Sequence, residues 1–138
     1  MKIIDWNISW VNAVASKIEY LKSQLSDEAF VIILQEVTPA AHLALVESFE
    51  NIAHVEYSLS FRKPSKRDST SRKLGIAILT SSHFAIKNAN VLPRALMPDR
   101  TLLLDVDYQG RSLRILGLHS ITGCASAKES YCISFAFP

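Results

Sequence analysis

The sequence is poor in cysteine, and its two cysteines are not arranged as metal ligands. Cys124 and Cys132 both lie near the C-terminal end of the 138 residues, and no CxxC pair occurs. A zinc site is therefore not expected. The cysteine usage favours two free thiols in a reducing compartment, while a disulfide between them stays open.

The sequence also lacks long apolar runs and a large excess of positive or negative charge. No apolar stretch is long enough to span a bilayer, and Asp5 interrupts the apolar run at the N-terminus, so no signal-peptide core is expected. The formal net charge of +2 is too small to indicate a nucleic-acid or membrane partner by itself. With 49% hydrophobic and 20% charged residues, the chain suits one globular domain over residues 1–138. We expect this domain to be soluble and cytoplasmic.

The first third of the chain follows a strand–helix–strand pattern. Residues 2–8 alternate like a strand, and residues 30–34 form a continuous apolar run that is typical of a strand covered on both faces. Between them, apolar residues recur at steps of three and four. This spacing predicts an amphipathic helix, capped by Ser9 or Asn12, whose inner face carries Val11, Val14, Ile18, Leu21 and Leu25. The three elements together predict a βαβ unit.

A second helix and a series of short strands are predicted after that unit. Thr38 is the expected N-cap, with Pro39 at the first helical position. The expected inner face of this helix comprises Leu43, Val46, Phe49 and Ile52. Short connections between the later strands favour antiparallel pairing. These strands are expected at residues 54–61, 74–79, 84–92, 101–108 and 112–118, with a tight hairpin turn at Gln109 and Gly110.

Four polar residues stand where predicted strands begin or end, which is where α/β sheets bind ligands. Glu36 comes just after the buried run, and its carboxylate suits a hard cation such as Mg²⁺. Asn7 ends the first strand and can orient a phosphate oxygen or a metal-bound water. His119 leaves the last strand and can donate to a phosphate or act as a general acid. Arg100 opens a strand and can clamp a phosphate.

Each of these residues also has an ordinary structural interpretation. Glu36 can be a solvated turn residue, and Asn7 can form an Asx turn into the helix. His119 can be a hydrogen-bonded surface histidine, and Arg100 can pair with Asp99. Taken one at a time, position favours the structural interpretation for Glu36, Asn7 and His119, and it does not separate the two interpretations of Arg100.

A basic loop at residues 62–73 is the strongest candidate for contact with nucleic acid. It carries six basic residues and one acid. Such side chains can neutralise backbone phosphates, although most charged loops are simply solvated. No aromatic residue lies among the charges, so stacking on bases is not supported. The candidate contact residues are Arg62, Lys63, Lys66, Arg67 and Arg72.

Five segments occur in an order that carries a family resemblance. They are Ile-Asp-Trp-Asn, Ile-Leu-Gln-Glu-Val, Leu-Gly-Ile-Ala-Ile-Leu, Asp-Arg-Thr-Leu-Leu-Leu-Asp-Val and Ile-Leu-Gly-Leu-His-Ser. Over residues 1 to about 129 the sequence resembles the endonuclease/exonuclease/phosphatase superfamily, in its deoxyribonuclease I-like branch. The resemblance implies an α/β (α+β) fold. That fold would be a deoxyribonuclease I-like half-sandwich, a mixed and mostly antiparallel sheet with helices on one face.

The resemblance also implies an activity, namely magnesium-dependent hydrolysis of a phosphodiester or phosphomonoester. Glu36 would hold Mg²⁺ (or Mn²⁺), and Asn7 would place the phosphate and the water shell of the metal. His119 would contact the scissile phosphate or protonate the leaving oxygen, and Arg100 would support the phosphate site. The substrate stays open among DNA, RNA, inositol phosphates and lipid head groups.

Two motifs of the family are missing from this sequence. Neither a Gly-Asp-x-Asn segment nor a Ser-Asp-His segment occurs. We therefore expect a truncated domain, inactive alone, with one apolar sheet face left bare and an unusual tail at residues 130–138. A bare face favours a homo-oligomer or pairing with a second half-domain. The alternative is a non-catalytic module that binds nucleic acid or oligomerises, using the loop at 62–73.

Overall fold

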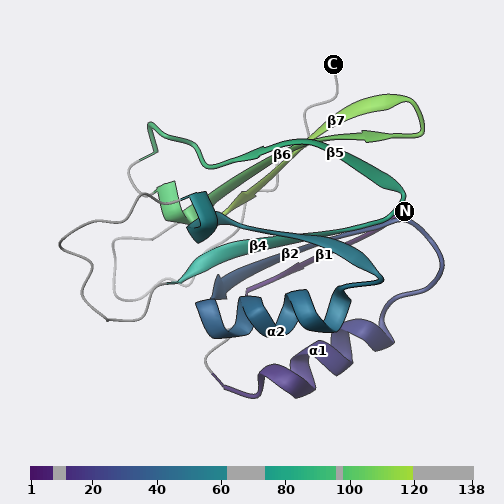
Figure 1. The fold of residues 1–138 in the computed structure, drawn as a ribbon, viewed down its shortest axis with the longest axis vertical. Helices are drawn as coiled ribbons and strands as arrows, with labels where there is room; N and C mark the ends of the chain where they lie inside the picture. Colours follow the sequence, from purple (N-terminus) through teal and green to yellow (C-terminus); the bar gives the residue numbers. More distant parts are fainter. Residues whose placement is uncertain (8–11, 62–73, 96–97, 120–138) are drawn as a thin grey trace.

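The computed structural model describes residues 1–7, 12–61, 74–95 and 98–119 of the chain (Figure 1). These residues form seven strands, two α-helices and two short 3-10 helices. In chain order they are β1 (Lys2–Trp6), α1 (Val14–Ser23), β2 (Phe30–Val37), α2 (Pro39–Phe49), β3 (Ala53–Tyr57), η1 (Ser58–Phe61), β4 (Gly75–Ser81), β5 (Phe84–Asn90), η2 (Pro98–Arg100), β6 (Thr101–Tyr108) and β7 (Arg111–Leu118).

The strands form two sheets that lie face to face. Sheet A has the order β1-β2-β4-β3, in which β1 and β2 run parallel and the other pairs are antiparallel. Sheet B has the order β5-β6-β7 and is antiparallel throughout. Figure 1 shows both helices on one side of sheet A and sheet B on its other side. The predicted fold class, mixed and mostly antiparallel with helices on one face, is confirmed.

Two apolar cores separate these layers, and β2 contributes to both. Phe30, Ile32 and Leu34 face the helices, while Val31 and Ile33 face sheet B. All five are buried. The continuous apolar run in the sequence is therefore explained by a central strand that is covered on both faces.

Helix α1 buries the stripe predicted for it but begins later than predicted. Ile18 and Leu21 are buried, and Val14 and Leu25 pack against the same core. The N-cap is Ala13, whose backbone is left-handed and which makes no side-chain cap hydrogen bond. The prediction that Asn12 caps the helix is therefore wrong, while Ser9 lies outside the described residues.

Helix α2 has the predicted cap but a different inner face. The Thr38 side chain accepts a hydrogen bond from the Ala41 amide at 3.1 Å. The buried positions are Ala41, Leu45 and Phe49. The prediction of an inner face with Leu43, Val46 and Ile52 is wrong, because these side chains are 68%, 40% and 41% exposed. The apolar residues of this helix lie all around its circumference, so its sequence is compatible with more than one apolar stripe at helical spacing.

The later strands follow the predicted order with shifted ends. Residues 54–61 are not one strand, because β3 ends at Tyr57 and the chain continues as η1. Strands β4 and β5 are joined by only two residues, yet they enter different sheets, so the prediction that neighbours with short connections pair fails there. The turn at Gln109 and Gly110 is confirmed, with φ values of 51° and 75°.

The prediction of a bare apolar sheet face is wrong for the centre of sheet A. Ile33, Ile76 and Ile78 pack against sheet B, which this chain supplies itself. The opposite face of sheet B carries two ion pairs across its strands, Lys87 with Asp107 and Arg114 with Asp105, beside the partly exposed Leu103 and Leu116. The cysteines and the tail at 130–138 lie outside the described residues. Of the helices that the structure describes, none has the length and apolar character needed to cross a membrane.

Candidate active site

A one-residue bulge near the end of β2 determines where Glu36 points. Leu34 pairs with Ala77 and Val37 pairs with Gly75, so three steps along β2 match two steps along β4. Glu36 has a φ of 56°, in the left-handed region. Strict alternation would place Glu36 on the helix side of the sheet with Leu34. Instead Val37 takes that core position and Glu36 turns away from it.

The β6–β7 hairpin brings Arg100 and His119 together. Thr101 pairs with Leu118, so the residues just beyond the ladder, Arg100 and His119, face each other. The His119 amide donates to the Arg100 carbonyl at 2.9 Å and extends the ladder by one step. The Arg100 guanidinium lies 3.1 Å from Nδ1 of the His119 ring. The strand register thus fixes this pair.

His119 also lies beside Glu36, and this contact joins the two sheets at one end. His119 Nε2 is 3.5 Å from Glu36 Oε1, with 12% and 30% of the two side chains exposed. A guanidinium can only donate, so Nδ1 accepts from Arg100 and the ring proton lies on Nε2, facing Glu36. Burial and the positive charge of Arg100 lower the pKa of His119, while Glu36 acts in the opposite direction. At neutral pH the ring is therefore an uncharged donor.

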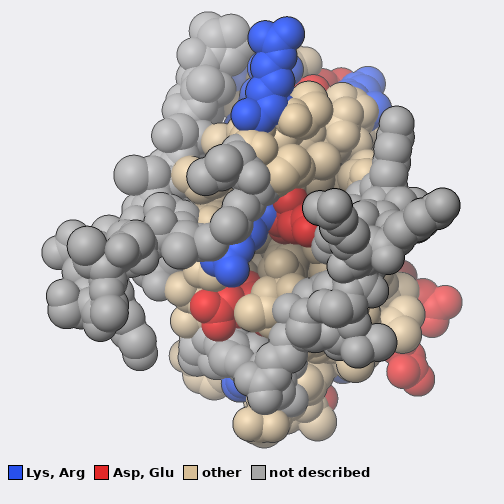
Figure 2. Space-filling model, turned by 90° about the vertical axis from the view of Figure 1, so that its left-hand side faces the viewer, with Lys and Arg blue, Asp and Glu red and all other residues tan. Residues whose placement is uncertain are grey.

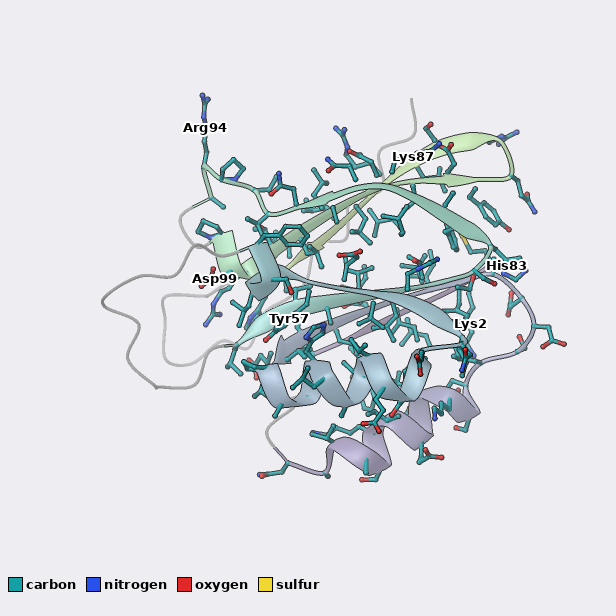
Figure 3. All side chains as sticks on the ribbon, viewed as in Figure 1. Lys2, Tyr57, His83, Lys87, Arg94 and Asp99 are labelled. Carbon is teal, nitrogen blue, oxygen red and sulfur yellow. The ribbon has the colours of Figure 1, made fainter. Side chains whose placement is uncertain are left out.

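Hydrogen bonds from neighbouring segments fix the backbone that carries Arg100. Ser58 Oγ donates to the Asp99 carbonyl at 2.6 Å and accepts from the Ile76 amide at 2.9 Å. Thr101 Oγ1 donates to the Pro98 carbonyl at 2.9 Å. Figure 3 shows Tyr57 and Asp99 at the same end of the molecule, away from Lys2 and His83. The approach of Arg100 to His119 therefore rests on both sheets.

Asn7 lies at the same end of sheet A, one strand away. It follows β1, where Trp6 pairs with Leu34 of the parallel strand β2. Its side chain is partly buried. The structure thus brings Glu36, Arg100 and His119 into one connected cluster and places Asn7 beside it at the sheet end.

Three further residues surround Glu36 and were missed by the sequence prediction. Gln35 Nε2 donates to Asp5 Oδ1 at 3.0 Å, and Tyr57 OH donates to the Val37 carbonyl at 2.8 Å. Burial raises the pKa of Asp5, although the Gln35 hydrogen bond opposes that shift. Burial, and then Asp99, raises the pKa of Tyr57. A polar Gln35 at the end of an apolar strand was the one signal for this arrangement in the sequence.

The proposed nucleic-acid contacts Arg62, Lys63, Lys66, Arg67 and Arg72 lie outside the described residues. The described residues that flank their loop are Phe61, which ends η1, and those leading into β4, which begins at Gly75 opposite Val37 of β2. Figure 2 views this end of the molecule and shows basic and acidic side chains side by side at its centre.

The donor set around Glu36 fits one kind of metal. Among residues 1–7, 12–61, 74–95 and 98–119, no group of three or more His, Cys, Asp or Glu side chains is placed to hold a metal ion. A closed zinc cage is therefore not formed by this part of the chain. Mg²⁺ often takes only one or two carboxylates and keeps several of its waters. The single, partly exposed carboxylate of Glu36 fits that mode of binding.

Comparison with solved structures confirms the fold. The chain matches the crystal structure of TDP2 from Caenorhabditis elegans with a TM-score of 0.64 and 19% identity, covering 87% of this chain and 35% of that one. It matches truncated C. elegans TDP2 with a TM-score of 0.62 and 19% identity, over 87% and 46% of the two chains. A humanized D. rerio TDP2 carrying 14 mutations matches with a TM-score of 0.60 and 18% identity, over 83% and 47%.

These structural similarities concern the fold, and they cover only part of the length of each matched chain. The chain spans about a third to a half of the solved structures that it matches. The resemblance to the deoxyribonuclease I-like superfamily is confirmed at the level of the fold. No family model matches the sequence. No curated protein matches it either.

Proposed function

We propose that this chain forms part of the active site of a magnesium-dependent phosphodiester hydrolase, of the nuclease or phosphatase type. The observation that carries the proposal is the connected cluster of Glu36, His119 and Arg100 at one end of a deoxyribonuclease I-like fold. Residues from distant parts of the sequence converge there and bring a carboxylate, an imidazole and a guanidinium together.

Each side chain has a role that its chemistry supports. Glu36 would hold Mg²⁺ or Mn²⁺, which supplies electrostatic stabilisation of the charge that develops on the phosphate. Arg100 donates to His119 and keeps the ring proton on Nε2, where it can form a hydrogen bond to a phosphate oxygen. The lowered pKa of His119 makes it a hydrogen-bond donor rather than a permanent cation. Asn7 would orient a phosphate oxygen with its amide.

The proposal includes low activity for the chain alone. The superfamily resemblance assigns the general base and the placement of the nucleophilic water to Gly-Asp-x-Asn and Ser-Asp-His segments, and neither occurs in the sequence. A metal ligand and hydrogen-bond donors with no base to generate the nucleophile give little rate enhancement. We expect the purified chain to show no nuclease activity above background. Magnesium-dependent cleavage that disappears in Glu36→Ala would contradict this expectation.

A magnesium titration followed by NMR tests the site itself. In the wild-type chain we expect shifts centred on Asn7, Glu36 and His119 that saturate with added Mg²⁺. Glu36→Ala should abolish them, because it removes the one carboxylate of the cluster. Glu47→Ala is the matched control, since Glu47 is an exposed carboxylate on α2. Equal shifts in both variants would show that Mg²⁺ binds elsewhere.

Binding of nucleic acid is a second candidate function, and the position of the basic loop favours it. The loop at 62–73 carries six basic residues and one acid, and β4, which follows it, begins at Gly75 opposite Val37, the residue after Glu36. We expect salt-sensitive binding to a DNA duplex that weakens when Arg62, Lys63, Lys66, Arg67 and Arg72 are neutralised. Neutralising the exposed Arg94 and Arg111 is the control. If neutralising the loop residues and neutralising the control residues weaken DNA binding equally, the loop is not the binding site and this candidate function is contradicted.

Association with a second copy or with a second half-domain also stays a prediction. In the described part of the chain, β1 pairs only with β2 and lies at the edge of sheet A. Ile3 on this strand is 39% exposed, and Met1, just before the strand, is 54% exposed. We expect light scattering to detect a dimer, and a monomer at all accessible concentrations would contradict self-association. A cytoplasmic location is a further prediction.

A further inference from the structure

The residues on both sides of Glu36 are hydrogen-bonded to side chains from other strands of sheet A. Before it, the side chain of Gln35 donates through Nε2 to Asp5 Oδ1 of β1 at 3.0 Å. After it, the Val37 carbonyl accepts from Tyr57 of β3 at 2.8 Å. Since β1 and β3 form opposite edges of sheet A, the bulge is held from two sides.

This restraint matters because the conformation of Glu36 is disfavoured. Its φ of 56° places a side chain with a Cβ in the left-handed region, which persists only where the surrounding structure holds it. Without that restraint β2 can relax toward regular alternation. The Glu36 carboxylate would then move toward the helix side of the sheet and away from His119.

The interaction between Asp5 and Gln35 is poorly explained by stability alone. Gln35 is 1% exposed, and its Oε1 has no hydrogen-bond partner among the residues that the structure describes. A buried polar atom left unpaired is unfavourable, and replacing both partners of such a pair with apolar residues is often neutral or stabilising. Burial of the Asp5 carboxyl adds a desolvation cost, seen in its raised pKa. What the pair does provide is a fixed direction for the Gln35 side chain, on the residue just before Glu36.

Tyr57 is itself held in place, so its hydroxyl is a fixed donor. The residue is 4% exposed. Its ring stacks on His42 of α2, with centroids 4.3 Å apart and planes 19° apart. The carbonyl that it binds belongs to Val37, where pairing with β4 resumes after the bulge. Tyr57 therefore fixes the far end of the bulge.

We propose that Asp5, Gln35 and Tyr57 are positioning residues that hold the β2 bulge and aim the Glu36 carboxylate at His119 and at the metal position. This inference deepens the proposed function and rests on the role of Glu36 within it. None of the three residues needs to touch substrate or metal. Their effect is transmitted through the backbone of residues 35–37.

Two variants test the two sides of the bulge separately. Asp5→Val combined with Gln35→Leu replaces the polar pair by an apolar one, and Tyr57→Phe removes a single hydroxyl. Both should retain the fold, with Tm within about 4 °C of the wild type for the double variant. Both should weaken the Mg²⁺ midpoint about tenfold, as loss of a ligand-orienting partner typically does. Tyr108→Phe, in sheet B, is the matched control and should leave the midpoint unchanged.

A conservative variant separates positioning from direct ligation. Asp5→Asn keeps a side-chain oxygen that accepts from Gln35 but removes the negative charge. A positioning role predicts an Mg²⁺ midpoint within about twofold of the wild type. A collapse of affinity equal to that of Glu36→Ala would mean that Asp5 binds the metal itself and would overturn the assignment.

A metal-free measurement keeps this inference distinct from the proposed function. In the wild-type chain, NMR should show a nuclear Overhauser contact between Glu36 and the His119 ring, and the double variant should lose it. If the wild-type chain binds no Mg²⁺, the proposed function fails and this contact alone decides the inference. A contact that persists in both test variants, or unchanged Mg²⁺ midpoints in both, would overturn the positioning role.

Discussion

At Glu36, the proposed metal ligand, the backbone has a left-handed conformation that is unfavourable for a residue with a side chain. Left-handed φ costs a residue with a Cβ about 1–2 kcal/mol, and glycine avoids most of this cost. We expect Glu36→Gly to unfold at an equal or higher temperature than the wild type, with a gain of up to about 1 kcal/mol, while the Mg²⁺ response disappears. Thermal denaturation of Glu36→Gly and Glu36→Ala side by side provides the comparison.

Glu36→Ala should be the less stable of these two variants, since alanine keeps the Cβ. Both lack the carboxylate, so only the backbone effect separates them. If Glu36→Gly unfolds at a lower temperature than Glu36→Ala, the backbone at this position is not strained and the reasoning from the bulge fails.

Two histidines give the stability of the chain a predictable pH dependence. Burial lowers the pKa of both His42 and His119 in the folded state. An unfolded chain, with histidine pKa values near 6.5, then binds more protons as the pH falls. Stability is therefore fully present above about pH 6.5 and decreases as the pH falls below it. The raised pKa values of Asp5 and Glu56 act in the opposite direction at lower pH.

The histidine effect should be measured between pH 7 and 6, above the range in which the carboxyls titrate. Urea denaturation at several pH values should give a free energy of unfolding that decreases toward pH 6. His42→Gln should flatten this dependence, because it removes one of the two groups. A free energy that rises toward pH 6 in the wild-type chain would contradict the assigned direction.

The residues of the cluster were predictable from sequence, and the residues that hold them were not. Glu36, Arg100 and His119 lie at the ends of strands. A polar residue at the end of a predicted strand can be recognised from the sequence alone. The roles of Asp5 and Tyr57 depend on which strands become neighbours and on a bulge. A bulge shifts the alternation of inward and outward side chains by one residue. The pattern of residues before the bulge does not predict it.

At the scale of the elements, Thr38 offers a direct test of helix α2. Its side chain accepts from the Ala41 amide at 3.1 Å and satisfies one of the free donors of the first turn. Thr38→Ala should lower the free energy of unfolding by about 1 kcal/mol, whereas Thr38→Ser should cost much less. Urea denaturation of both variants checks this prediction. Equal losses would mean that the methyl group, not the hydroxyl, stabilises the helix start.

The buried face of a helix was predicted correctly where its sequence has one apolar stripe, and incorrectly where several apolar stripes are possible. Helix α1 has one apolar stripe, and its buried residues were predicted correctly. Helix α2 carries apolar residues around its circumference, and the stripe chosen from sequence includes Leu43, which is 68% exposed. Packing against α1 and sheet A determines which stripe of α2 is buried. The sequence of α2 alone holds no information on that packing. Likewise, a two-residue connection cannot reveal that β4 and β5 belong to different sheets.

At the scale of the whole molecule, Gly117 controls how closely the two sheets approach. A Cβ at this position would lie 2.9 Å from Ile76 Cγ2 and 3.3 Å from Ile33 Cγ2. Gly117→Ala should therefore destabilise the fold by about 1–3 kcal/mol, as overpacking does. Gly110→Asn is the control, because a Cβ there meets no atom of the described residues within 4 Å and asparagine tolerates left-handed φ. Equal Tm values for Gly117→Ala and the wild type would contradict the close packing.

The hairpin register has a consequence for the order in which the cluster forms during folding. Arg100 and His119 are 19 residues apart and joined by one tight turn, whereas Glu36 and His119 are 119 − 36 = 83 residues apart. Hairpins form within microseconds, while contacts between distant segments wait for slower chain closure. We expect pulse-labelled hydrogen exchange to protect β6 and β7 before β2, and simultaneous protection would contradict this order. A refolding chain would then pass through a state in which the arginine and histidine are already paired while the glutamate has yet to arrive.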